Sequence, residues 1–197
     1  MRLIILPILF FLSLFLLLDR EEENRIKSMT IGDLIFTLDT KTLGKPWVSK
    51  EKNYLSFDLS LPDLSPYQRE KHGKNKVRIN VKVVGENYIT TTDRLANTQS
   101  NFGATFNANS PYSDLDYYST ADKYNFEYFY MEAQDDLLMA KCDKIKEPYS
   151  PQCHISYISL SDQVIAKYFY PRTFLSDWKV IHSKIRLLLY NSINKEI

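Results

Sequence analysis

The fold is decided by residues 135–194, which read DDLLMAKCDKIKEPYSPQCHISYISLSDQVIAKYFYPRTFLSDWKVIHSKIRLLLYNSIN. Residues 137–140 are apolar, and residues 154–160 carry apolar side chains on both faces. Residues 163–170 have the same character, and Pro171 closes them because proline cannot donate a hydrogen bond to a sheet. Apolar runs of this length between turn signals are typical of buried strands. We therefore expect two successive hairpins of antiparallel strands.

Two cysteines flank the first of these turns. The ten residues between Cys142 and Cys153 include two prolines and four charged side chains, which indicates a loop. A disulfide can form at the base of the hairpin if the two Cα atoms come within roughly 7 Å. Redox or metal chemistry is the alternative, but there is no C-x-x-C motif and no third or fourth soft ligand at metal spacing. The sequence favours a structural disulfide, which would contribute on the order of 2–3 kcal/mol in the chain-entropy model.

A helix is expected after the second hairpin. Thr173 and Ser176 can cap its start, and Asp177 lies in its first turn. Apolar side chains then recur every three to four residues, at Phe174, Trp178, Ile181, Ile185, Leu188 and Leu189. This spacing predicts an amphipathic helix that packs on one face of the sheet. We expect Trp178 to be its buried anchor rather than a binding-site aromatic.

The N-terminus is typical of an export signal. An arginine precedes residues 3–18, which are apolar apart from one proline and one serine. As a helix this run would span about 24 Å, slightly less than a bilayer core. No small residues mark a cleavage site after it, which favours an uncleaved signal anchor over residues 1–18 rather than a cleaved signal peptide.

The charges around this segment predict its orientation. The positive end lies before it and an acidic cluster follows, which favours a cytoplasmic N-terminus. We therefore expect a linker over residues 19–30 and an extracytoplasmic domain over residues 31–197. The protein would cross the inner membrane once and hold this domain in the periplasm, where a disulfide can persist.

The remaining strands are predicted from the alternation of apolar and polar residues. Residues 54–61 and residues 77–83 are apolar at every second position, as expected when one face of a strand meets the core. Residues 33–38 and 125–131 are further strand candidates. The predicted class is α+β, with a mostly antiparallel sheet and a C-terminal amphipathic helix packed on one face. A basic loop at residues 69–76 is interpreted as a solvated hairpin tip, with contact to anionic lipid or an acidic partner as the alternative.

Residues 87–123 lack periodicity and are rich in Asn, Ser, Thr, Asp and Tyr, so we expect them to be largely loop. Long loops in compact domains are usually functional surfaces or poorly ordered insertions, and both interpretations stay open. Tyrosine provides a large contact area at low entropic cost, which favours a protein-binding surface. The candidate contact residues are Tyr112, Asp114, Asp116, Tyr117, Tyr118 and Tyr124.

No catalytic motif stands out. The three histidines are scattered without paired spacing, and the chain has no G-x-S-x-G, phosphate-cradling glycine loop or S-x-x-K. With 25 basic and 24 acidic residues, no global field suggests a nucleic-acid partner. We expect no catalytic, metal-binding or cofactor-binding site and no enzymatic activity. A Ser/His/Asp set assembled from distant positions stays open.

The C-terminal third, together with the anchor, resembles small inner-membrane or periplasmic proteins found beside type VI secretion effectors, where they act as immunity proteins. The shared traits are an apolar anchor, a cysteine hairpin, a strand that ends in proline and a helix with the pattern W-x2-I-x4-R-x-L-L-x2-S. The residues of this chain that show these traits are Cys142, Cys153, Pro171, Trp178, Ile181, Arg186, Leu188 and Ser192.

That resemblance implies that the protein binds and neutralises a cognate toxin acting in the periplasm or on the membrane. It assigns no inhibitory residue, because the shared residues look structural. The alternative is an envelope structural or assembly protein whose aromatic surface packs on a membrane-complex partner.

Overall fold

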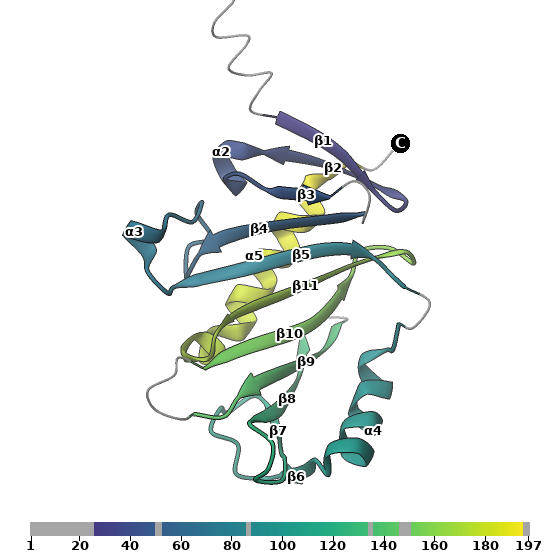
Figure 1. Ribbon diagram of the computed structural model, residues 1–197, viewed down its shortest axis with the longest axis vertical. Helices are drawn as coiled ribbons and strands as arrows, with labels where there is room; N and C mark the ends of the chain where they lie inside the picture. The colour runs from purple at the N-terminus through teal and green to yellow at the C-terminus, as the bar shows by residue number, and fades with distance from the viewer. Residues whose placement is uncertain (1–25, 50–52, 86–87, 134–135, 146–150, 195–197) are drawn as a thin grey trace, which may run out of the picture.

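The computed structural model describes residues 26–49, 53–85, 88–133, 136–145 and 151–194. Its largest element is a nine-stranded antiparallel sheet, shown in Figure 1, with the strand order β3-β4-β5-β11-β10-β9-β8-β7-β6. The strands are Trp47–Ser49 (β3), Tyr54–Ser60 (β4), Lys76–Val83 (β5), Thr105–Asn107 (β6), Asp116–Ser119 (β7), Phe126–Ala133 (β8), Asp136–Asp143 (β9), Gln152–Ser159 (β10) and Val164–Pro171 (β11). The antiparallel sheet and both predicted hairpins are confirmed.

The disulfide is also confirmed. Cys142 lies directly opposite Cys153 in the β9–β10 pair, with 4.0 Å between the two Cα atoms. Both cysteines are fully buried. The covalent bond therefore joins two central strands in the interior of the domain.

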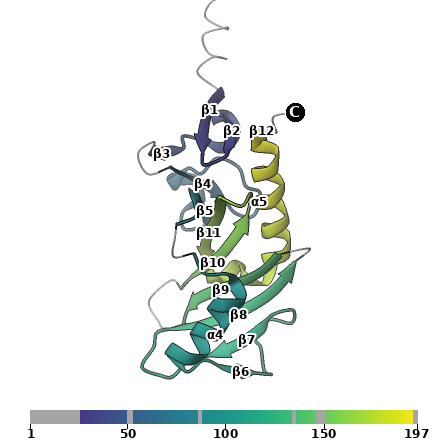
Figure 2. The same ribbon diagram turned by 90° about the vertical axis from the view of Figure 1, so that its right-hand side faces the viewer.

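Helix α5 (Trp178–Ser192) lies along one face of the sheet, behind it in Figure 1 and beside it in Figure 2. This arrangement confirms the α+β class. The helix buries Trp178, Ile181, Ile185 and Leu189 against the sheet, and Trp178 is 3% exposed. The predicted capping residues lie instead in a 3-10 turn (Arg172–Asp177) that precedes α5, and the Asp177 side chain makes no capping hydrogen bond.

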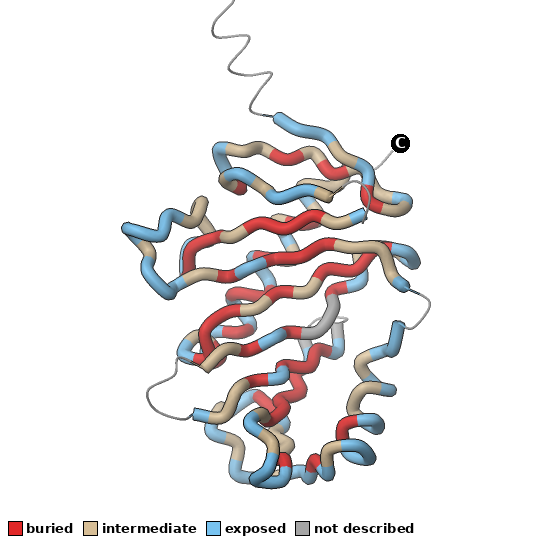
Figure 3. Tube along the Cα trace, viewed as in Figure 1, coloured by how far each residue is buried: buried red, intermediate tan, exposed pale blue. Residues whose placement is uncertain are grey.

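Alternation along the strands builds the core. In β4 and β5 the apolar positions face α5 and are buried, as predicted: Leu55, Phe57, Leu59, Val77, Ile79 and Val81. Figure 3 shows that buried residues follow the central strands, whereas β1 (Ile26–Ile31) and the short helix α3 (Arg69–His72) are mostly exposed. The basic loop predicted at residues 69–76 therefore contains a helical turn on the surface. Another short helix, α2 (Thr40–Leu43), follows strand β2 (Leu34–Asp39).

A second sheet contains β1 (Ile26–Ile31), β2 (Leu34–Asp39) and β12 (Ile193–Asn194), in the order β1-β2-β12. Residues 26–30, which we predicted to be linker, thus form a strand. The turn between β1 and β2 requires Gly32, because its φ is +58° and an added Cβ would come within 2.8 Å of Val164 Cγ2. Residues 3–18, the predicted anchor, lie outside the described residues. No helix in the described ranges is long and apolar enough to cross a membrane.

The predicted loop over residues 87–123 is wrong in large part, because it contains helix α4 (Thr91–Phe102) as well as β6 and β7. Thr90 caps the helix by accepting a hydrogen bond from the Asp93 amide at 3.1 Å, and Gly103 ends it in a left-handed conformation. Helix α4 packs on the sheet face opposite α5, where Leu95 and Phe102 contact the cluster that includes Tyr128, Tyr130 and Met139.

Candidate functional site

The side chains of the sheet that point away from α5 form what we call the outer face. Strand registers align one continuous row of them across six strands. The row runs through Asp58, Arg78, Phe169, His154, Lys141 and Tyr128. Charged, polar and aromatic groups therefore lie side by side on this face, in contrast to the apolar face beneath α5.

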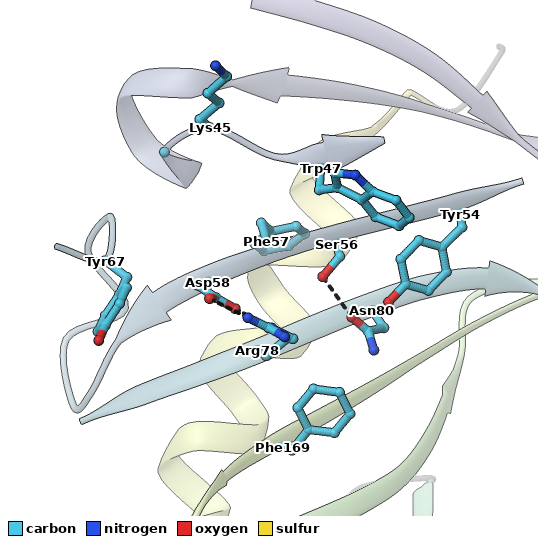
Figure 4. Close-up of a pocket in the computed structure, with 11 residues that line it drawn as sticks. Lys45, Trp47, Tyr54, Ser56, Phe57, Asp58, Tyr67, Arg78, Asn80 and Phe169 are labelled. Atoms are coloured by element: carbon cyan, nitrogen blue, oxygen red, sulfur yellow. Dashed lines mark hydrogen bonds and ion pairs between the residues drawn. The ribbon is translucent and has the colours of Figure 1, made fainter. Parts of the chain in front are cut away.

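A pocket of about 550 Å³ opens on the outer face over β3, β4 and β5 (Figure 4). Its aromatic lining comes from β3, β4, the segment before α3 and β11, and consists of Trp47, Tyr54, Phe57, Tyr67 and Phe169. The polar side chains of the lining are Lys45, which precedes β3, Ser56 and Asp58 from β4, and Arg78 and Asn80 from β5. The four residues of β4 and β5 alternate with buried apolar ones along these strands, so the pleat of the sheet positions them.

An ion pair forms one end of the pocket floor. Asp58 accepts hydrogen bonds from Arg78 Nε at 2.7 Å and Arg78 Nη2 at 2.9 Å, and Lys76 Nζ lies 3.0 Å away. Partial burial on its own would raise the pKa of Asp58, but hydrogen bonds and charge from Arg78 and Lys76 outweigh it and hold this pKa below its usual value. The carboxylate is therefore ionised and fixed in place near neutral pH.

The other end of the floor is a buried hydrogen bond. Ser56 Oγ donates to Asn80 Oδ1 at 2.8 Å, and both side chains are buried. Above it, Trp47 is 59% exposed and meets Tyr54 edge-on, with 5.3 Å between the ring centroids. Figure 4 shows the aromatic rings around this floor, so the pocket presents apolar walls over polar groups that are already ordered. Such an arrangement suits the binding of a side chain or small group that is partly apolar and partly polar.

The structure does not gather the predicted contact residues into one surface. Tyr112 and Tyr117 pack on Phe129 from the α5 side, at ring centroid distances of 5.3 and 5.2 Å. By contrast, Tyr118 contacts Tyr130 on the outer face, and Tyr124 packs against Phe102 of α4. The tyrosines are thus divided between the two sides of the sheet, and none of them is fully exposed.

The two predicted acidic contact residues are exposed. Asp114 Oδ2 forms an ion pair with Lys179 Nζ at 2.6 Å, which ties the segment before β7 to α5. Asp116 lies opposite Tyr130 in the register of β7 and β8. Neither residue lines the pocket, so the predicted surface and the pocket are separate parts of the molecule.

A buried ionic network lies beneath β7 and β8. Arg172 pairs with Glu127, and Arg172 Nη1 also donates to the Asp143 carbonyl oxygen at 2.6 Å. The Tyr117 hydroxyl donates to Glu127 Oε2 at 2.8 Å, while burial, followed by this hydrogen bond, raises the pKa of Tyr117 to about 12. Both members of the ion pair are at least nine-tenths buried, so the network is a structural feature of the interior.

Sequence reasoning missed the pocket because it followed the apolar positions of each strand. The signal was present at the intervening positions: Tyr54, Ser56 and Asp58 alternate with buried residues in β4, and Arg78 and Asn80 do so in β5. Trp47 and Phe169 carried no comparable signal, because their proximity to these strands depends on the order of the strands in the sheet.

Within the described part of the chain, no three His, Cys, Asp or Glu side chains come together as possible metal ligands. No protein-family model matches the sequence, and no curated protein matches it. Solved structures do show its fold. The chain resembles Smlt3025, an immunity protein of the Stenotrophomonas maltophilia type IV secretion system, with a TM-score of 0.63 and 14% identity over 87% of this chain and 94% of that one.

A second similar structure is the iron-regulated outer membrane lipoprotein FrpD of Neisseria meningitidis. It has a TM-score of 0.53 and 12% identity, and the match covers 87% of this chain and 93% of FrpD. Both likenesses establish the class of fold, in which an antiparallel sheet carries a C-terminal helix. The type VI association stays a prediction, since the similar immunity protein is described for a type IV system.

Proposed function

We propose that this protein is an immunity protein, which binds a cognate secreted antibacterial toxin and neutralises it. The observation that carries the proposal is the fold shared with Smlt3025 along nearly the whole length of both chains. An independent point of agreement is the resemblance of the C-terminal third to secretion-associated immunity proteins. The two lines use different information, since one compares backbone shape and the other compares residues.

The geometry of the pocket also supports binding rather than catalysis. Its carboxylate is engaged by Arg78 and Lys76, and its serine hydroxyl donates to Asn80. A nucleophilic serine needs an adjacent base that accepts its proton, and here the acceptor is a neutral amide oxygen. The pocket therefore offers recognition groups, and we propose that the protein has no enzymatic activity.

We further propose that residues 3–18 anchor the chain in the inner membrane with residues 31–197 in the periplasm. The buried disulfide supports export, because disulfides persist in oxidising compartments. Envelope fractionation should recover the full-length chain in the membrane pellet, and its thiols should react with maleimide only after reduction. Free thiols before reduction, or a chain found only in the soluble fraction, would contradict this location.

Protection from a toxin tests the function itself. The toxin would be the product of a gene beside the one that encodes this chain, directed to the periplasm of a susceptible host. Coexpression of the exported full chain should restore growth, because binding removes free toxin. The same chain without residues 1–18 should stay in the cytoplasm and fail to protect, which provides the matched control. Equal killing with and without the exported chain would rule out immunity to that toxin.

The alternative function is that of an envelope structural or assembly protein. The observation that favours it is the likeness to FrpD, which is described as an outer membrane lipoprotein. In that case deletion of the gene should alter the envelope in cells that encounter no toxin. An immunity protein should instead be dispensable whenever its toxin is absent, so the phenotype of a strain lacking both genes separates the two functions.

A further inference from the structure

The outer face is open over β4, β5 and β11, whereas α4 packs on it over β8 and β9. In Figure 1 it is turned toward the viewer, with α5 behind it and α4 beside its lower strands. Over β4, β5 and β11 it carries the pocket, and its rim includes Trp47, one of the most exposed large apolar side chains among the described residues. A tryptophan with 59% exposure beside a preformed pocket is typical of an interface anchor rather than of a surface that meets only water.

Over β5, β11 and β9 the charge of this face is predominantly positive. The registers of β5, β11 and β9 place Arg78, Lys82, Lys167 and Lys141 on it. Burial is the main reason why the pKa of His154 is lowered; Asp143 raises it, and Lys167 and Lys141 lower it. Helix α3, which precedes β5 in the chain, carries Arg69 and Lys71 together with one acidic residue, Glu70.

The acidic groups of this face near the pocket are already engaged, and two others, Asp116 and Glu132, lie further away on β7 and β8. Asp58 is paired with Arg78 and Lys76, and Asp143 Oδ2 accepts a hydrogen bond from the Gln152 amide at 3.1 Å. A partner that approaches the outer face therefore meets aromatic rings and cations. Complementary charge accelerates association, and a preordered floor lowers the entropy lost on binding.

We propose that the outer face, centred on the pocket beside Trp47, is the surface that binds the toxin, and that the toxin contributes an acidic segment with one aromatic or aliphatic side chain. That side chain enters the pocket between Trp47 and Phe169, while the carboxylates of the segment lie against Lys167 and its neighbours. This inference rests on the proposed function, and it assigns recognition to the end of the sheet formed by β3, β4, β5 and β11 rather than to residues 87–123.

Two substitutions in the full chain test the surface, with the purified toxin as the probe. Trp47→Ala should weaken the complex about 30-fold, as expected for the loss of a central aromatic anchor. Lys167→Glu should weaken it about tenfold, mainly through slower association, and should reduce the dependence of affinity on salt. Neither substitution changes a side chain of the buried core. A thermal unfolding midpoint equal to that of the parent chain would verify that each variant is folded.

Matched controls lie on the opposite side of the molecule. Leu187 is 62% exposed on α5, and Lys184 is exposed on the same helix. Leu187→Ala and Lys184→Glu should bind the toxin with affinity within about twofold of the parent chain. If all four variants bind like the parent, the toxin uses another surface and the inference is wrong, although the proposed function stands. If the parent chain itself does not bind, the proposed function fails and the inference fails with it.

Discussion

Replacing Arg172 with methionine should lower the free energy of unfolding by about 3–5 kcal/mol, because the change leaves the Glu127 carboxylate buried without its cation. The Asp143 carbonyl oxygen loses a donor in the same step. Folded domains are typically stable by only about 5–15 kcal/mol, so this loss would be a large fraction of the total. Urea unfolding followed by tryptophan fluorescence measures it, since the midpoint should fall while the slope stays constant.

A double substitution distinguishes the loss of charge pairing from a simple loss of packing. Adding Glu127→Gln removes the orphaned charge, and the glutamine oxygen can still accept the hydrogen bond that Tyr117 donates to Glu127 in the parent. The double variant should therefore recover part of the stability that the single variant loses. If the two variants were equally unstable, the ion pair would not be the reason for the loss.

Replacing Trp178 with alanine should also cost about 3–5 kcal/mol, because the substitution leaves a large cavity in the packed interface between α5 and the sheet. The side chain is 3% exposed and belongs to the main core cluster. Thermal unfolding should show a lower midpoint, and hydrogen exchange should show that α5 loses protection before the central strands do.

Val180 provides the control for this prediction. It lies two residues further along α5 and is 58% exposed. Val180→Ala should change stability by no more than about 0.5 kcal/mol, since the side chain buries little surface. Equal effects at the two positions would mean that α5 does not present its tryptophan to the sheet.

The elements that sequence analysis predicted well are those in which periodicity and burial agree. Strands β4 and β5 alternate because one face meets the core, and α5 repeats its apolar residues because one stripe covers the sheet. The disulfide followed from the cysteines at the two ends of a loop. In each case the information was local to a stretch of about ten to twenty residues, which is the range over which pattern reasoning is strongest.

The elements that sequence analysis missed bury little of their surface. Helix α4 contributes one fully buried residue, Thr98, so its apolar repeat is weak and its caps at Thr90 and Gly103 were the better signal. Strand β1 buries only Ile31 and is paired through the hairpin at Gly32. A segment of this kind acquires its structure from neighbours and caps rather than from an apolar face of its own.

The pocket could not be predicted from any one stretch of sequence, for a different reason. Trp47 and Tyr54 meet across the β3–β4 pair, whereas Phe169 reaches the pocket because β11 lies next to β5. The pairing of β5 with β11 brings together residues about ninety positions apart in the sequence. It therefore depends on the topology of the sheet and not on any single stretch. The tyrosine-rich segment, by contrast, looked like a surface in sequence but divides its rings between the two faces of the sheet.

An immunity protein of the kind proposed binds its toxin stoichiometrically. The most direct test mixes the purified full chain, in mild detergent, with the purified toxin encoded beside it and measures the mass and affinity of the complex by light scattering and titration calorimetry. The proposed function predicts a single complex of fixed stoichiometry with a Kd below about 1 μM. A toxin that is active but forms no complex with the folded, disulfide-bonded chain at tens of micromolar, roughly the upper limit of such an assay, would contradict it.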